Sequence, residues 1–273
     1  MSAEKQKIEE KNPQSAIRNP QYRLGCDIGG TFTDFVLVDD ETGQFQINKC
    51  LTTPADPSDA VEEGIRGLLE RVPGFMPKID EIIHGTTLVI NAIIERKGAK
   101  TALITTRGFR DVLELGREMR YDAYDIFAEY PEPLVPRSLR KEVTERITAD
   151  GRVVVKLNPD EVGRVVAGLL DSEIESLAVC LINSYENPSH EVRIKEIVNK
   201  IAPDLSLSTS FEVLPQIREY ERTCTTTTNA YVKPITAKYL AKLNARLESL
   251  GFKGHLFIML SIWGITSVET ARQ

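Results

Sequence analysis

Residues 22–38, YRLGCDIGGTFTDFVLV, decide the fold. YRLGCDI is a short apolar run that stops at Gly29-Gly30, and a second run, DFVLV (34–38), follows at once. Turn residues come next in DDETG, and FQINKCLTT (45–53) has the composition of a third strand. Three successive strands joined by tight turns predict an antiparallel meander.

The turn between the first two strands is the sharpest motif, because it places glycines, hydroxyls and carboxylates together. Glycines let the backbone turn tightly enough for its N–H groups to line a phosphate. Threonine hydroxyls can donate to phosphate oxygens, and an aspartate at the end of the first strand can hold a metal-bound water beside them. The alternative is a hairpin turn with incidental acids. The pattern favours a phosphate-binding loop made of Asp27, Gly29, Gly30, Thr31, Thr33 and Asp34, with Asp27 as the metal contact through water.

The rest of the chain has the pattern of an α/β protein. Helices are predicted over 57–71, 88–98, 107–116, 158–174, 187–202 and 218–250, the last interrupted near Lys233-Pro234. Strands are predicted over 79–87, 100–106, 176–183, 205–210 and 254–260, with a hairpin over 141–157. Gly98 and Gly151 are expected at a helix end and in a turn. Alternating strands and helices argue for a layered α/β fold.

Composition and charge exclude several classes of function. The chain has 34 Lys and Arg against 40 Asp and Glu, a net charge of −6, which argues against a general nucleic-acid binder. No stretch approaches the roughly 20 apolar residues of a membrane helix, and the polar N-terminus lacks the apolar run of a signal peptide. None of the four cysteines forms a CxxC pair, so we expect reduced thiols and a cytoplasmic protein.

The chain resembles the hydantoinase A and 5-oxoprolinase family within the actin-like ATPase superfamily. The resemblance runs from residue 22 to about residue 261 and rests on motifs in the family's order: DIGGTFTD, KCLTTPADPSDAVEEGI, IIHGTTLVINAIIERKGAKTALITTRGFRDVLELGR, EPLVPR, VTERITADG, NSYENPSHE and REYERTCTTTTNAYVKP. It implies an actin-like (ribonuclease H-like) ATPase lobe with an additional α/β segment. It also implies a disordered tail at 1–21, the family's N-terminal region at 22–210 and the start of its catalytic domain at 211–273.

The resemblance implies an ATP-dependent hydrolase subunit that opens a cyclic amide of the hydantoin or 5-oxoproline type by phosphorylating its carbonyl oxygen. ATP and Mg²⁺ (or Mn²⁺) are the implied cofactors, and a hydantoinase B-type subunit is the implied partner. Relatives also include acetone and acetophenone carboxylases. A ketone carboxylase subunit therefore stays an alternative, as does a non-catalytic remnant or assembly partner.

The resemblance also implies further site residues. His84, Gly85, Thr86 and Thr87 form a family signature that lines the cleft, with His84 as a catalytic candidate whose charge would be tunable near neutral pH. The alternative is that His84 satisfies a loop carbonyl.

Three arginines are candidates for substrate contacts. Arg107 follows a buried strand, where α/β sheets often present ligand contacts, or lies on a solvated helix face. Arg218 and Arg222, at helical spacing, would share a face and bind a substrate carboxylate, or would pair with Glu219 and Glu221.

Two features depart from the family pattern. Family members continue for several hundred residues and carry a second phosphate loop and the adenosine site. The chain therefore resembles an incomplete N-terminal portion of the catalytic subunit, inactive as an isolated 273-residue chain. The second departure is the turn Ser261-Ile262-Trp263-Gly264, where the family usually has small and polar residues.

Overall fold

The computed structural model describes residues 21–53, 56–117, 124, 125, 127, 129, 131–260 and 264–271. The chain forms two compact units. Unit 1 contains the described residues up to Gly85 together with Asn244–Ser267, and unit 2 contains Thr86–Leu243 and the residues from Val268 onward. Residues 1–20 of the predicted tail at 1–21 lie outside the described residues, as do the turn residues Ser261–Trp263.

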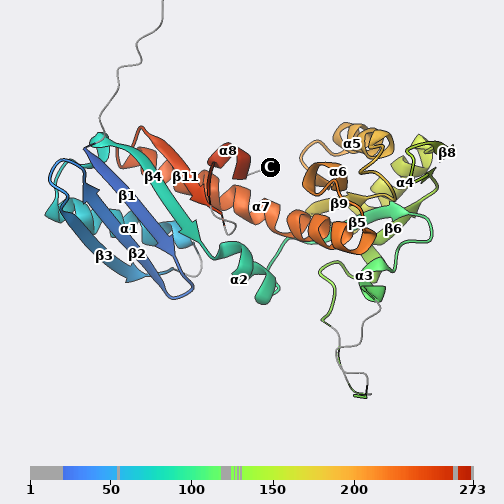
Figure 1. Ribbon diagram of the computed structural model, residues 1–273, viewed down its shortest axis with the longest axis horizontal. Coiled ribbons are helices and arrows are strands. Elements are labelled where there is room, and N and C mark those ends of the chain that lie inside the picture. Colours follow the sequence, from blue (N-terminus) through green and yellow to red (C-terminus); the bar gives the residue numbers. More distant parts are fainter. Residues whose placement is uncertain are drawn as a thin grey trace, which may run out of the picture. The chain divides into compact units, whose positions relative to one another are not determined.

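Unit 1 is built on a mixed six-stranded sheet (Figure 1). Its strands, in spatial order, are β12 (Ile265–Ser267), β11 (His255–Met259), β4 (Ile79–Thr86), β1 (Tyr22–Ile28), β2 (Phe32–Asp39) and β3 (Phe45–Leu51). The pairs β1–β2 and β2–β3 are antiparallel, so the predicted meander is confirmed. β11 runs parallel to β4 and antiparallel to β12. β4 and β11 thus extend the meander on its β1 side, and β3 is the opposite edge of the sheet.

One face of this sheet packs on helix α1 (Pro57–Arg71). Alternate residues of the meander point to that face, and Leu24, Phe35 and Leu37 are at most 2% exposed there. Asp56 caps the helix by accepting a hydrogen bond from the Ser58 N–H at 3.2 Å. Gly64 allows the close approach, since a Cβ at this position would lie 2.0 Å from Cε2 of Phe35.

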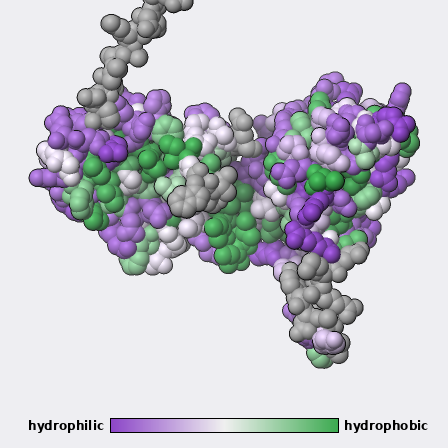
Figure 2. Space-filling view, viewed as in Figure 1, coloured by the Kyte–Doolittle hydropathy of each residue, from purple (hydrophilic) through white to green (hydrophobic). Residues whose placement is uncertain are grey.

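The opposite face of the meander is open in the described structure. Phe45, Ile47 and Leu51 are 60%, 57% and 65% exposed on it. Figure 2 shows apolar side chains interspersed with polar ones over the strands of unit 1. Strand alternation therefore sends the exposed residues of the meander, including two candidate aspartates, to the face opposite α1.

Arg71, in the last turn of α1, lies against β3, which is an edge strand of the sheet. Its Nη1 donates to the carbonyl oxygen of Ile47 at 2.8 Å, and its Nη2 donates to Oδ1 of Asn48 at 2.7 Å. Asn48 in turn donates to the carbonyl of Gly64 at 2.7 Å. These bonds fix the helix to the edge strand and occupy one of the strand's outward-facing carbonyls.

Unit 2 contains a parallel four-stranded sheet. Its strands, in spatial order, are β10 (Ser206–Thr209), β9 (Ser176–Cys180), β5 (Thr101–Thr106) and β6 (Arg140–Val143). Every residue of β5 and β9 is buried, as expected for central strands of a parallel sheet covered on both faces. The hairpin predicted over 141–157 is wrong in part, because β6 joins the parallel sheet and only β7 (Arg146–Ile147) pairs with β8 (Val153–Val155).

The predicted helices of unit 2 are present in order and with shorter bounds, and the short helices α6 (Ser210–Val213) and α8 (Val268–Ala271) were not predicted. The predicted helices are α2 (Leu88–Ile94), α3 (Val112–Leu115), α4 (Pro159–Leu170), α5 (Ser189–Ile201) and α7 (Glu219–Ser249), whose residues from Asn244 belong to unit 1. Short 3₁₀ turns occur at Met76–Lys78 and Arg137–Leu139. None of the helices in the described part of the chain is long and apolar enough to span a membrane.

Two local expectations are corrected by packing. The helix α7 continues through Pro234, although an interruption was expected there, because buried residues on either side such as Tyr231 and Leu240 hold it in place. Gly98 does not cap a helix: a Cβ there would lie 1.9 Å from the Tyr231 ring, so the glycine permits close packing. Gly151 has a φ of 79° in the β7–β8 turn, as expected.

Candidate functional site

The turn between β1 and β2 is held in place by Thr52, just beyond β3. The Thr52 hydroxyl donates to the Gly29 carbonyl at 2.9 Å, and its N–H donates to the Thr31 carbonyl at 2.8 Å. The Gly29 N–H donates to the Phe32 carbonyl at 2.9 Å. Gly30 and Thr31 are exposed at the tip, where a ligand can reach them. Thr33 is fully buried and its hydroxyl lies 3.0 Å from that of Thr52, so it supports the turn from inside.

Two predicted acids lie directly opposite each other across β1 and β2. Asp27 is the register partner of Asp34, and both are exposed on the open face of the sheet. Like charges opposite each other on one face repel. Lys49 on β3 is the register partner of Asp34 and donates to its carboxylate oxygens at 2.8 and 3.2 Å. The three side chains therefore form a charged row across the meander, beside the glycine turn.

This charged row fits a magnesium ion, which is bound through one or two carboxylates and keeps several waters. The predicted metal contact is Asp27 through water, and Asp34 is the second carboxylate that could hold the ion. In the part of the chain that the structure describes, no group of three or more His, Cys, Asp or Glu forms a closed metal cage. A site with two carboxylates suits an ion that also binds phosphate oxygens.

The end of β4 lies beside the end of β1. A Cβ at Gly85 would lie 2.7 Å from Oδ1 of Asp27. Any residue other than glycine would therefore displace the Asp27 carboxylate from its present position. The adjacent His84 is 1% exposed, and its Nδ1 lies 3.3 Å from the carbonyl oxygen of Cys26. Because a carbonyl can only accept, Nδ1 carries the proton in this contact. The structure thus brings Asp27, His84 and Gly85 together at the ends of two neighbouring strands.

Burial lowers the pKa of His84 to about 4, and only the hydrogen bond to the Cys26 carbonyl opposes this shift. The ring is therefore neutral at pH 7. The expectation that its charge is tunable near neutral pH is wrong, because burial removes the imidazolium form from water and so lowers the pKa of the ring. The contact with the Cys26 carbonyl agrees with the alternative that His84 satisfies a backbone group.

The low pKa of His84 predicts acid lability of unit 1. The folded-state pKa lies below the ordinary value of 6.5, so the unfolded chain binds more protons between pH 6.5 and 4, and stability falls as the pH falls through this range. We expect a loss of about 2 kcal/mol at pH 5 relative to pH 7. Urea unfolding at several pH values measures it. His84→Gln should flatten the dependence, whereas replacing the exposed His255 by Gln should not.

The two threonines of the HGTT signature shape the start of α2. The Thr86 hydroxyl accepts a hydrogen bond from the Leu88 N–H at 3.1 Å. The Thr87 hydroxyl accepts one from Nδ2 of Asn91 at 3.1 Å. Both side chains are half-buried, so the signature serves as a strand-to-helix connection as well as a candidate ligand contact.

The three candidate arginines have different environments in unit 2. Arg107 is 66% exposed and pairs with Glu161 at 3.3 Å. Arg218 has a φ of 83° and is 72% exposed, 4.0 Å from Glu221. Arg222 is 1% exposed. The prediction that Arg218 and Arg222 share a helix face is wrong, because α7 begins at Glu219 and Arg218 lies in a left-handed conformation before it.

Arg222 helps to hold the backbone of one residue, Leu181. Its Nη2 donates to the Leu181 carbonyl at 2.6 Å and its Nη1 donates to the Gln216 carbonyl at 3.2 Å. The Leu181 N–H donates to Oε1 of the buried Glu191 at 2.8 Å. Burial raises the pKa of the Glu191 carboxyl. Two buried side chains, those of Glu191 and Arg222, thus hold Leu181 just after β9 by its N–H and by its carbonyl.

We expect Arg222→Lys to lower the free energy of unfolding by about 2 kcal/mol. A lysine cannot reach both carbonyls in a planar fork, so a buried acceptor loses its donor. Urea unfolding measures the loss. The exposed Arg218→Lys is the control and should change stability by less than about 0.5 kcal/mol. Unchanged stability together with a raised KM for a carboxylate substrate would restore Arg222 as a substrate contact.

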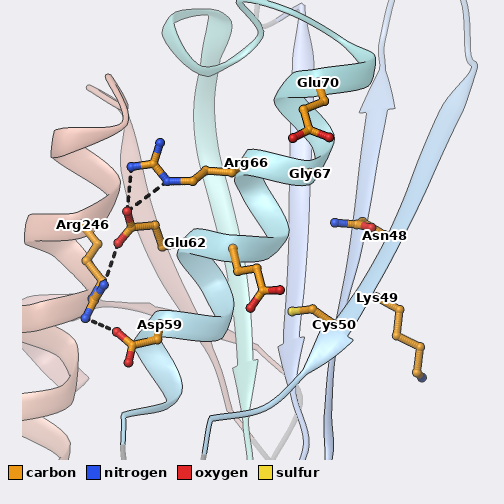
Figure 3. Close-up of a pocket in the computed structure, with 10 residues that line it drawn as sticks. Asn48, Lys49, Cys50, Asp59, Glu62, Arg66, Gly67, Glu70 and Arg246 are labelled. Atoms are coloured by element: carbon orange, nitrogen blue, oxygen red, sulfur yellow. Dashed lines mark hydrogen bonds and ion pairs between the residues drawn. The ribbon is translucent and has the colours of Figure 1, made fainter.

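A groove of about 560 Å³ lies on the other side of the meander, between β3 and α1 (Figure 3). Its walls include four acidic side chains, Asp59, Glu62, Glu63 and Glu70. Arg246 donates to Asp59 and to Glu62, and Arg66 also donates to Glu62 at 2.7 Å. These arginines lower the pKa of Glu62. The groove is acidic and internally paired, so it does not fit phosphate groups.

Comparison with known sequences places the chain in a family. The pattern of the hydantoinase/oxoprolinase N-terminal region matches residues 23–202, and that of hydantoinase/oxoprolinase matches residues 222–273. The chain therefore belongs to the hydantoinase/oxoprolinase family, and the predicted family and α/β fold class are confirmed.

Individual relatives match over most of this chain. The chain is 38% identical to an uncharacterized protein of Methanocaldococcus jannaschii, over 92% of this chain and 37% of that one. It is 38% identical to the alpha subunit of caprolactamase from Pseudomonas jessenii, over 85% of this chain and 34% of that subunit. The chain thus spans about a third of the length of these relatives.

Two solved structures share the fold. The structure of ATP-dependent caprolactamase from Pseudomonas jessenii matches with a TM-score of 0.84 and 34% identity, over 90% of this chain and 36% of that one. Nucleotide-free acetone carboxylase matches with a TM-score of 0.81 and 27% identity, over 92% of this chain and 37% of that one. The family therefore includes ATP-dependent enzymes that act on a cyclic amide and on a ketone.

Proposed function

We propose that this chain supplies nucleotide-phosphate contacts in an ATP-dependent enzyme that opens a cyclic amide of the hydantoin or 5-oxoproline type. The observation that carries the proposal is the pair Asp27 and Asp34, which flank the Gly29-Gly30 turn at the end of β1 and the start of β2 and lie beside Gly85 of β4. The caprolactamase relative, which is named as ATP-dependent, supports the cyclic-amide class.

In the proposed reaction, the amide carbonyl oxygen takes the terminal phosphoryl group of ATP and ADP leaves. Water then adds to the activated carbon, the C–N bond breaks with a proton going to the ring nitrogen, and hydrolysis of the resulting acyl phosphate releases the carboxylate and phosphate. Asp27 would hold and orient a water of a bound magnesium ion next to the phosphates, at the position that Gly85 leaves open. The exposed backbone and hydroxyl of Gly30 and Thr31 bind phosphate oxygens. The buried, neutral His84 acts in this scheme as a hydrogen-bonding support of the Cys26 carbonyl rather than as a charge.

Relatives such as the caprolactamase alpha subunit are named as subunits, which suggests that the enzyme works as a complex, and we propose a hydantoinase B-type protein as the partner. The test measures ATP consumption by the chain with this partner, using hydantoins, 5-oxoproline and caprolactam as substrates and Mg²⁺ as the metal. We expect a cyclic amide to stimulate ATP consumption and to be opened in the same reaction.

A second candidate is a subunit of an ATP-dependent ketone carboxylase. The 34% identity to the acetophenone carboxylase gamma subunit of Aromatoleum aromaticum, over 87% of this chain, favours it. ATP consumption that responds to acetone or acetophenone plus bicarbonate, and to no cyclic amide, would replace the first proposal by this one. The absence of any substrate response would favour a non-catalytic assembly partner.

A further inference from the structure

Lys49 is a basic residue of the unit 1 sheet, and it lies at the end of the meander that carries the turn between β1 and β2. The six strands of unit 1 contain two lysines or arginines, Arg23 and Lys49. Arg23 pairs with Asp40 at 2.6 Å, beside the turn between β2 and β3, at the other end of the meander. Lys49 is the register partner of Asp34, three residues past the Gly30-Thr31 tip.

The position of the Lys49 ammonium is defined by two contacts. Its Nζ lies 2.8 Å from Oδ1 of Asp34 and 4.7 Å from the centroid of the Phe32 ring, at the start of β2. The side chain is 52% exposed and points away from α1 (Figure 3). Cys50, the next residue, points toward the helix instead (Figure 3). Lys49 therefore stands on the face that carries Asp27 and Asp34.

The charges of the row pose a problem for an anionic ligand. Two carboxylates and one ammonium leave the row negative, and such a surface repels phosphate groups. A divalent cation between the carboxylates reverses the sign. The same cation competes with Lys49 for the Asp34 oxygens, because both take the same lone pairs.

We propose that Lys49 is a phosphate contact of this site. When a divalent cation binds the two aspartates, the Lys49 ammonium breaks its contact with Asp34 and binds the nucleotide phosphates instead. The proposal rests on the proposed function. An exposed Lys–Asp pair contributes little stability, so exchanging it for a phosphate contact is not costly. A lysine binds phosphate as a point charge on a flexible stem, and this stem allows the ammonium to swing from Asp34 toward the turn.

The test compares binding of ATP, in excess Mg²⁺, by the wild-type chain and its variants, by calorimetry or NMR at millimolar ligand. Lys49→Met should weaken binding about tenfold, and Lys49→Arg should stay within about threefold of wild type. Lys195→Met is the matched control, because Lys195 forms a comparable surface pair with Glu212 at 2.5 Å in unit 2. Adenosine should bind Lys49→Met as it binds wild type, since the lost charge acts on phosphates.

A second measurement uses the unaltered chain and so does not depend on a variant that folds. Acetylation of lysines is followed by mass spectrometry with and without Mg²⁺ and ATP. Lys49 should be protected by the nucleotide several-fold, whereas Lys195 should react equally under both conditions.

The outcomes separate the two proposals. If the wild-type chain binds ATP, Lys49→Met binds it with the same affinity, and Lys49 is not protected, the role of Lys49 is overturned. The proposed function then still stands. A wild-type chain that binds no ATP overturns both. Protection of Lys49 together with a weakened, folded Lys49→Met supports the proposal.

Discussion

Replacing Asp27 by alanine is expected to lower ATP turnover of the assembled enzyme at least ~100-fold, about 2.7 kcal/mol in the activation barrier. The carboxylate is exposed beside the glycine turn and stands opposite Asp34, where it would hold the metal-bound water. Its removal also relieves the repulsion between the two acids, so we expect no loss of folding stability.

The control for Asp27→Ala is Asp40→Ala, another exposed aspartate, which pairs with Arg23 beside the turn between β2 and β3. It should leave ATP turnover within about twofold, since surface substitutions away from a site have small effects. Steady-state ATP consumption measures both variants, and thermal unfolding confirms that they fold. Near-normal turnover by Asp27→Ala would remove this residue from the metal and phosphate role.

Gly254→Ala is expected to produce the largest loss of stability in unit 1, about 3 kcal/mol, at the upper end of overpacking effects. Gly254 immediately precedes β11, which pairs with β4. A Cβ here would lie 2.1 Å from the carbonyl oxygen of Asp80. The obstacle is backbone, so a side-chain rotation cannot relieve it, and β11 must move away from β4.

Urea unfolding measures the effect of Gly254→Ala against a matched glycine. Gly163 lies inside α4 with open space around its Cα, so Gly163→Ala should stabilise the chain by about 0.5–1 kcal/mol. A Gly254→Ala chain as stable as wild type would mean that β11 does not approach β4 as closely as described.

The fold was largely predictable where periodicity and turn residues agree. The meander of β1–β3 follows from alternating buried residues such as Leu24 and Leu37 between glycine-rich turns. The expected hairpin at 141–157 failed because short apolar runs do not specify their partners, and β6 paired with β5 far away in sequence. The course of α7 through Pro234 could not be predicted either, because tertiary packing outweighed the local helix-breaking tendency of proline.

The candidate site was predictable as a set of residue types but not as a geometry. The closeness of Gly85 to Asp27 depends on the pairing of distant strands, which the family resemblance only suggested. Lys49 was not predicted as a site residue because it lies on β3, outside the motif between β1 and β2. Counting register across both turns, from Asp27 to Asp34 and from Asp34 to Lys49, would have found it. The burial of Arg222 could not be read from helical spacing, because it depends on where α7 begins.

The bonds from Arg71 to β3 have a consequence for how this chain behaves in concentrated solution. An uncovered strand at a sheet margin offers a ladder of backbone groups to other copies, and here that strand also carries the exposed Phe45, Ile47 and Leu51. By occupying the Ile47 carbonyl with a charged side chain, Arg71 interrupts the ladder in its middle. The arginine that anchors the helix thereby also opposes aggregation of the chain through edge-to-edge strand pairing.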